Sequence, residues 1–123
     1  MHELPITESV LAIVIDTAKQ NGGGRVTAIN LVIGEMTSVV DDSVQFYFDI
    51  LSKNTLADGA TLNFCREPAT ATCLDCQHQT SVKPPIMPLC PGCGSSRLVV
   101  SGGTEFFIES IEMEDGNEND SGS

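Results

Sequence analysis

The sequence predicts an α+β fold, in which a three-stranded sheet packs with two helices and a small module is inserted between the last two strands. Three observations support this prediction: two helix-like apolar periodicities, three strand-like segments, and a cysteine-containing stretch that lacks either period. At 123 residues, the chain has room for one domain and a small module, but not for two large domains.

Both predicted helices follow from apolar residues spaced three and four positions apart. The first runs from Pro5 to about Asn21, with Pro5 tolerated in its first turn and the glycines at 22–24 ending it. The apolar face of this helix is expected to contain Ile6, Val10, Ile13, Val14 and Ala18. The second helix is expected to start at Asp41 or Asp42, either of which can act as a cap. Its apolar side contains Val44, Tyr47, Phe48 and Leu51.

The three strands of the main sheet are predicted from β-branched residues and from alternation of apolar and polar side chains. They run over residues 25–34, 61–67 and 106–113. The first strand is expected to turn one apolar face inward, formed by Ile29, Leu31 and Ile33. In the last strand the apolar phase slips, which indicates a bulge near Glu109.

Composition and charge exclude several classes of protein. The net charge of −11 disfavours nucleic-acid binding, because that affinity comes largely from Lys and Arg neutralising phosphates. No run of about 18 apolar residues exists to cross a bilayer, and the first residues lack the zones of a signal peptide, so a cytoplasmic protein is expected. An enzyme is not expected, since the sequence shows no nucleophile and base pair, and the glycines at 22–24 follow a helix where a phosphate-binding loop would precede one.

Four of the five cysteines lie in two C-x-x-C pairs, which predict a structural zinc site. Two residues between thiolates let both sulfurs reach one tetrahedral ion at about 2.3 Å, and Gly92 and Gly94 relieve the backbone of the second turn. Four thiolates leave no open position for water, so catalysis at this ion is not expected. The expected ligands are Cys73, Cys76, Cys90 and Cys93. The alternatives are a dithiol redox centre or disulfides, while Cys65 and His78 are interpreted as a strand residue and a surface residue.

The zinc ribbon also sets the predicted domain boundaries. Residues 1–67 and 104–114 are expected to form the α+β domain, and residues 68–103 the zinc-binding domain, which is rich in Pro, Gly and Cys. Residues 115–123 are expected to be a disordered acidic tail, because they are polar and carry no apolar anchor.

The start of the chain suggests a second metal site. With a free amine at Met1, the amine, a deprotonated backbone amide and the His2 imidazole can enclose a Cu(II) or Ni(II) ion in adjoining chelate rings, the tetragonal geometry that these ions prefer. Glu3 can add an oxygen ligand or tune the site. These residues alone leave the choice of ion open.

The order of motifs resembles the HypA family of hydrogenase nickel chaperones. The features that match are Met-His-Glu at the start, Ile-Gly-Glu at 33–35, two C-x-x-C pairs, and the final strand Ile-Glu-Ser-Ile-Glu at 108–112. The resemblance spans Met1 to about Glu114. Pro5 departs from the pattern, because relatives often carry a Ser there that can cap the first helix.

The resemblance implies a nickel carrier that holds zinc separately. Nickel, the cargo, would be bound at Met1, His2 and Glu3, with an acidic residue, Asp41 or Asp42, as a further ligand in some members. Zinc would be bound by Cys73, Cys76, Cys90 and Cys93. The implied partners are the HypB GTPase and the large subunit of [NiFe]-hydrogenase, with urease maturation proteins as further candidates, and the chain would be a monomer or a homodimer. The alternative is a zinc-ribbon adaptor that binds a macromolecule and delivers no nickel.

Overall fold

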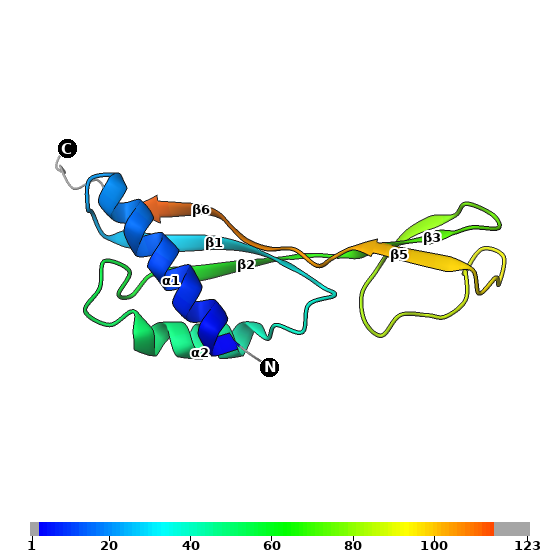
Figure 1. The fold of residues 1–123 in the computed structure, drawn as a ribbon, viewed down its shortest axis with the longest axis horizontal. Helices are drawn as coiled ribbons and strands as arrows, with labels where there is room; N and C mark the ends of the chain where they lie inside the picture. Colours follow the sequence, from blue (N-terminus) through cyan, green and yellow to red (C-terminus); the bar gives the residue numbers. More distant parts are fainter. Residues whose placement is uncertain (1–2, 115–123) are drawn as a thin grey trace. The chain divides into compact units, whose positions relative to one another are not determined.

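The computed structural model describes residues 3–114, and in this range the chain forms two helices and six strands. In chain order they are α1 (Glu3–Gln20), β1 (Val26–Gly34), α2 (Asp41–Leu51), β2 (Thr61–Glu67), β3 (Ala69–Cys73), β4 (Gln79–Val82), β5 (Leu98–Gly102) and β6 (Phe106–Met113). The strands form two three-stranded sheets, with the orders β2-β1-β6 and β4-β3-β5 (Figure 1). This arrangement confirms the predicted α+β fold. The predicted tail, residues 115–123, lies outside the described residues, as do Met1 and His2.

The described chain divides into two compact units. The first contains residues 3–31, 39–64 and 108–114, and the second contains residues 32–38 and 65–107. The predicted domain boundaries, after residues 67 and 103, stay a prediction. Within the part of the chain that the structure describes, neither helix combines the length and the hydropathy that a membrane span requires.

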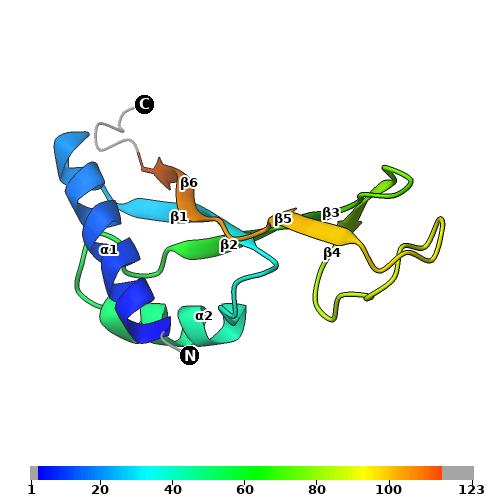
Figure 2. The same ribbon diagram turned by 45° about the vertical axis from the view of Figure 1, so that its right-hand side comes forward.

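In the first unit, α1 crosses the strands of the sheet in Figure 1 and stands to one side of them in Figure 2, so it covers one face of the sheet. The buried residues of α1 are Glu3, Thr7, Val10, Val14 and Ala18. The prediction for Ile13 was wrong, because its side chain is 55% exposed. Polar Thr7 does lie in the buried face, and its hydroxyl is not left unpaired there, because it donates a 2.6 Å hydrogen bond to the Glu3 carbonyl.

Helix α2 contributes Val44 and Phe48 to the core, as predicted. The predicted cap was wrong: Val40 is the N-cap residue, and its side chain makes no capping hydrogen bond. Asp41 and Asp42 are instead the first residues of the helix, where their negative charges interact favourably with the helix dipole.

The central strand β1 is the most buried strand of the molecule's first sheet. Ile29, Leu31 and Ile33 are at most 1% exposed, which confirms the predicted inward face. In β6 the alternation of exposed and half-buried residues shifts phase at Glu109 and Ser110, as the sequence indicated. The bulge itself stays a prediction.

The second unit contains a sheet that the sequence analysis did not predict. Strand β3 lies in the middle and pairs antiparallel with both neighbours, so that Thr70 lies opposite Ser81 of β4 and Ser101 of β5. The buried side chains of β3 are small: Ala69, Ala71 and Cys73. A core this small supports the expectation that a metal ion contributes to folding.

Two glycines make the closest backbone approach in this unit. A Cβ atom on Gly34 would lie 2.0 Å from the carbonyl oxygen of Gly103, and Gly103 itself has a φ of +72°. Hydrogen bonds hold the approach in place, because Gly34 donates to the carbonyl of Glu105 at 2.7 Å and Met36 donates to that of Gly103 at 2.7 Å. No side chain fits at Gly34 without moving this backbone.

Candidate metal centre

The two C-x-x-C pairs form turns with the same backbone hydrogen bonds. In the first, between β3 and β4, the amide of Gln77 donates to the carbonyl of Cys73 at 2.9 Å. In the second, between β4 and β5, the amide of Gly94 donates to the carbonyl of Cys90 at 2.8 Å. The amides of Cys73 and Cys90 likewise each donate to a carbonyl five residues later. Each turn therefore presents its two sulfurs in the same way.

Both turns require a left-handed residue directly after the second cysteine. Gly94 has a φ of +78°, which confirms the role predicted for it. Gly92 is not left-handed, so the same reason does not apply there. The equivalent residue of the first turn is Gln77, with a φ of +63°, a conformation that costs a residue with a Cβ about 1–2 kcal/mol.

We expect Gln77→Gly to stabilise the zinc-loaded module by about 0.5–1 kcal/mol, since it removes this strain but adds chain entropy to the unfolded state. The reciprocal control, Gly94→Gln, introduces the strain but lowers the chain entropy of the unfolded state, so it should destabilise by about 0.5–1 kcal/mol. Chemical unfolding of the zinc-loaded proteins measures both changes. Equal stability of all three proteins would contradict the proposed role of the left-handed position.

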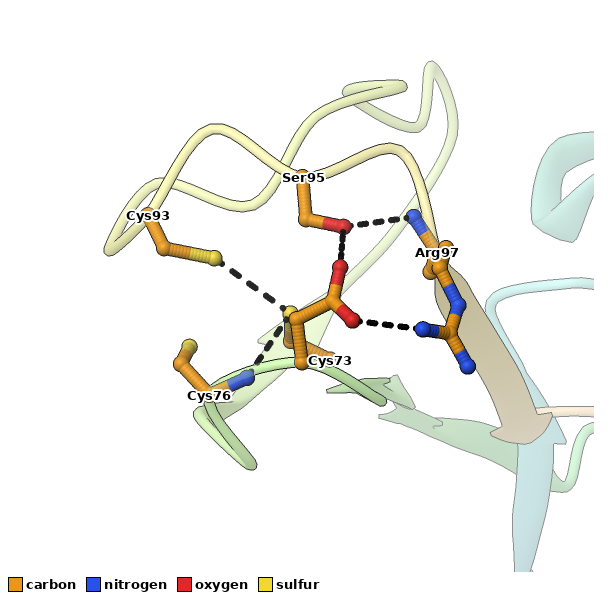
Figure 3. Close-up of polar contacts among 6 residues, drawn as sticks. Cys73, Cys76, Cys93, Ser95 and Arg97 are labelled. Atoms are coloured by element: carbon orange, nitrogen blue, oxygen red, sulfur yellow. Dashed lines mark hydrogen bonds and ion pairs between the residues drawn. The ribbon is translucent and has the colours of Figure 1, made fainter.

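The four sulfurs form a cluster of the size that zinc requires. All four Sγ atoms lie within 4.8 Å of one another. Cys73 Sγ and Cys93 Sγ are 3.6 Å apart (Figure 3), and so are those of Cys76 and Cys90. A zinc–sulfur bond of about 2.3 Å gives a tetrahedron whose edge is roughly 3.8 Å. The group of four cysteines fits a structural zinc site.

Backbone amides stabilise two of the thiolates. The Cys76 amide, 3.5 Å from Cys73 Sγ, lowers the pKa of Cys73 to about 6 although burial opposes the shift. The Cys93 amide likewise lowers the pKa of Cys90. For Cys93, the Ser95 amide lowers the pKa, but the neighbouring thiols of Cys73 and Cys76 outweigh it and raise the value to about 12. The four thiols therefore do not ionise together unless a cation balances their charge.

The remaining candidates do not join this cluster. Cys65 is exposed on β2, where its Sγ lies 3.7 Å from Glu67 Oε2, and His78 is exposed next to the first turn. All five cysteines lie within the described residues, and none forms a disulfide. The sulfur separations of 3.6 Å, between Cys73 and Cys93 and between Cys76 and Cys90, are far beyond a disulfide bond of about 2.05 Å.

At the other candidate site, the structure describes Glu3 but not Met1 or His2. Glu3 is only 5% exposed, and its Oε2 accepts a 2.9 Å hydrogen bond from the amide of Val40. Val40 directly precedes Asp41, which is half-buried, and Asp42, which is exposed. Glu3 therefore fixes the start of α1 beside the start of α2, where the two acidic residues lie.

One group of interacting residues was not predicted from the sequence. Asp75, in the first cysteine turn, bonds to Ser95 and Arg97, which follow the second. Asp75 and Ser95 lie 20 residues apart. Nothing in the local sequence pairs them, because their contact depends on the two turns meeting around one site.

An α+β unit combined with a cluster of four cysteines that fits zinc is typical of a small metal-binding protein. The family model described as "Hydrogenase/urease nickel incorporation, metallochaperone, hypA" matches residues 1–113. The chain belongs to this family, HypA, which confirms the resemblance seen in the sequence.

Individual proteins that resemble this chain support the same family assignment. The chain is 45% identical over 115 residues to a protein named hydrogenase maturation factor HypA from Dehalococcoides mccartyi strain CBDB1, covering 94% of this chain and 96% of that protein. It is 37% identical to one of the same name from Alkalilimnicola ehrlichii, covering 93% and 100%.

Solved structures resemble the fold. A solution structure of a HypA protein shares 26% identity and a TM-score of 0.63, covering 93% of this chain and 97% of that one. The solution structure of the Ni metallochaperone HypA from Helicobacter pylori has a TM-score of 0.59 at 24% identity, covering 92% and 97%.

Proposed function

We propose that this chain binds Ni(II) through Met1, His2 and Glu3 and delivers it to the large subunit of [NiFe]-hydrogenase, while the four cysteines hold a structural zinc ion. Membership of a nickel-incorporation family supports the cargo and the process. The observation that carries the location of the site is the Met-His-Glu start, which offers an amine, backbone amides and an imidazole in succession.

The surroundings of Glu3 support a nickel site at this end of the first unit. Because Oε2 of Glu3 accepts the Val40 amide, the Glu3 carboxylate also ties the start of α1 to the start of α2. Asp41, next to Val40 in the chain, is then the better candidate for a carboxylate ligand than the more exposed Asp42. Nitrogen and oxygen donors suit a nickel carrier, because the carrier must release the ion to its target as well as bind it.

Delivery of nickel requires partner proteins, but it does not require this chain to catalyse a reaction. Relatives are named as maturation factors and metallochaperones, which supports transfer of nickel within the hydrogenase maturation machinery. The HypB GTPase is the proposed partner that precedes the hydrogenase large subunit, and urease maturation proteins are the further candidates that the family description suggests.

His2→Ala is expected to abolish tight nickel binding, because it removes the imidazole from the chelate. Zinc content and helical circular dichroism should not change, since four cysteine sulfurs are sufficient for a complete zinc site. Isothermal titration of untagged, zinc-loaded protein with Ni(II) measures the loss. His78→Ala is a matched control, because His78 is the second of only two histidines, and it should bind nickel like the parent.

The alternative, a zinc-ribbon adaptor, makes the opposite prediction for the same titration. If the His2→Ala protein binds nickel as tightly as the parent and the His78→Ala protein, the terminal site is not the nickel site. A parent protein that holds zinc but no nickel would favour the adaptor outright.

A further inference from the structure

The two cysteine turns meet at the cluster of four sulfurs, and side-chain bonds also join them. Ser95 Oγ donates to Asp75 Oδ2, and Arg97 Nη1 contacts Asp75 Oδ1 at 2.7 Å. The Arg97 amide completes the group with a 3.0 Å hydrogen bond to Ser95 Oγ (Figure 3). Both carboxylate oxygens of Asp75, in the first turn, therefore contact the segment that follows the second turn.

The same segment is tied to both turns through its backbone. The carbonyl of Arg97 accepts the amide of Leu74 at 2.9 Å, and the carbonyl of Ser95 accepts the amide of Cys90 at 2.7 Å. Leu74 belongs to the first turn and Cys90 to the second. Residues 95–97 therefore contact both turns through bonds that involve no metal atom.

These contacts lie close in the chain to the two exposed cysteines of the cluster. Cys73 and Cys90 are buried, at 0% and 3% exposure, whereas Cys76 and Cys93 are exposed. Asp75 directly precedes Cys76, and Ser95 follows Cys93 by two residues. The hydrogen bond between Asp75 and Ser95 restrains the chain next to the two exposed cysteines, Cys76 and Cys93.

Charge gives Arg97 a second role. One zinc ion with four thiolates carries a net charge of about −2, and Asp75 adds another negative charge within the first turn. The Arg97 guanidinium pairs with that carboxylate and offsets the repulsion. Both side chains are partly exposed, at 64% for Arg97 and 40% for Asp75, so the ion pair by itself contributes little to stability. The ion pair matters instead because it keeps the two cysteine turns in position relative to each other.

We propose that Asp75, Ser95 and Arg97 form a brace that positions the two cysteine pairs around zinc and slows the release of the ion. The brace acts on the zinc ion and does not depend on nickel delivery. It is a positioning device, since none of its three side chains belongs to the group of sulfurs that fits the ion.

The test measures zinc transfer from the full, zinc-loaded chain to the chromogenic chelator 4-(2-pyridylazo)resorcinol, without nickel. We expect Asp75→Ala and Ser95→Ala to accelerate transfer about tenfold or more, because each removes hydrogen bonds to a charged group. Ser95→Thr and Arg97→Lys keep a hydroxyl and a positive charge, so they should release zinc more slowly than Ser95→Ala and Arg97→Ala. Asp49→Asn is the charge control: Asp49 accepts a 2.8 Å hydrogen bond from Gln45 on α2, outside the zinc-binding unit.

A second measurement separates positioning from general stability. In Co(II)-substituted protein, the visible ligand-field bands report the arrangement of the four sulfurs. We expect these bands to shift in Asp75→Ala and to match the parent in Asp49→Asn and Ser95→Thr. If Asp75→Ala does not retain metal on purification, the proposal stands only if Ser95→Ala still shows the faster release and Ser95→Thr restores the parent rate. Parent-like release and parent-like bands in Ser95→Ala and Arg97→Ala would overturn it.

Discussion

Gly34→Ala is expected to destabilise the second unit by at least about 3 kcal/mol, which exceeds the usual cost of a surface substitution. The added methyl group would lie 2.0 Å from the Gly103 carbonyl oxygen and 2.7 Å from the Thr104 amide nitrogen. These are backbone atoms held by hydrogen bonds, so they cannot rotate away as a flexible side chain could. Thermal unfolding of the zinc-loaded protein measures the change.

Two other glycines separate the clash from backbone strain. Gly102 has a φ of +75° and open space around its Cβ position, so Gly102→Ala should cost only the strain, about 1–2 kcal/mol. Gly103 combines a φ of +72° with a Cβ position 2.9 Å from the Ala69 amide nitrogen, so its substitution should cost more than that of Gly102. A Gly34→Ala protein no less stable than Gly102→Ala would show that the close approach is not required.

Removal of zinc is expected to unfold β3, β4 and β5 while α1 and α2 remain folded. The zinc-binding unit buries few large side chains, whereas structural zinc in zinc-finger peptides contributes about 10–16 kcal/mol of apparent binding free energy. The helices pack against a core of their own that includes Val14, Ile29 and Phe48. Hydrogen exchange followed by mass spectrometry, with and without a chelator, locates the loss of protection.

A pair of cysteine variants provides the matched control. Cys73→Ser removes a buried ligand and should reproduce the effect of the chelator, whereas Cys65→Ser changes an exposed cysteine outside the cluster and should retain zinc and protection. Full protection of β3 to β5 in metal-free protein would contradict a folding role for the ion.

The sequence was sufficient to predict the features that depend on local periodicity or on a metal-ligand spacing. The bounds of β1 and β6 and the inward face of β1 follow from side-chain alternation. The four cysteines follow from their paired spacing, because each turn is built from a few consecutive residues. Such features need no knowledge of distant contacts.

Features that carry no apolar signal, or that depend on distant partners, were missed. Ile13 carries the apolar character expected of a core residue, yet Thr7 occupies the buried face because a backbone carbonyl satisfies its hydroxyl. The alternating Ala and Thr residues of β3 carry almost no hydrophobic signal, and their strand exists because β4 and β5 supply hydrogen bonds from both sides. The contact between Glu3 and Val40 joins residues 37 positions apart.

Burial of one cysteine in each pair gives metal exchange an expected order. Cys76 and Cys93 face the solvent, so a competing ligand or an electrophile meets these sulfurs first. Cys73 and Cys90, held in the interior, are then the last to let go of the ion. Cys73 and Cys90 would continue to hold a zinc ion after Cys76 and Cys93 had been displaced, which would allow the exposed cysteines to bind it again. Brief exposure to a competitor therefore costs the protein little zinc, and only a sustained one empties the site.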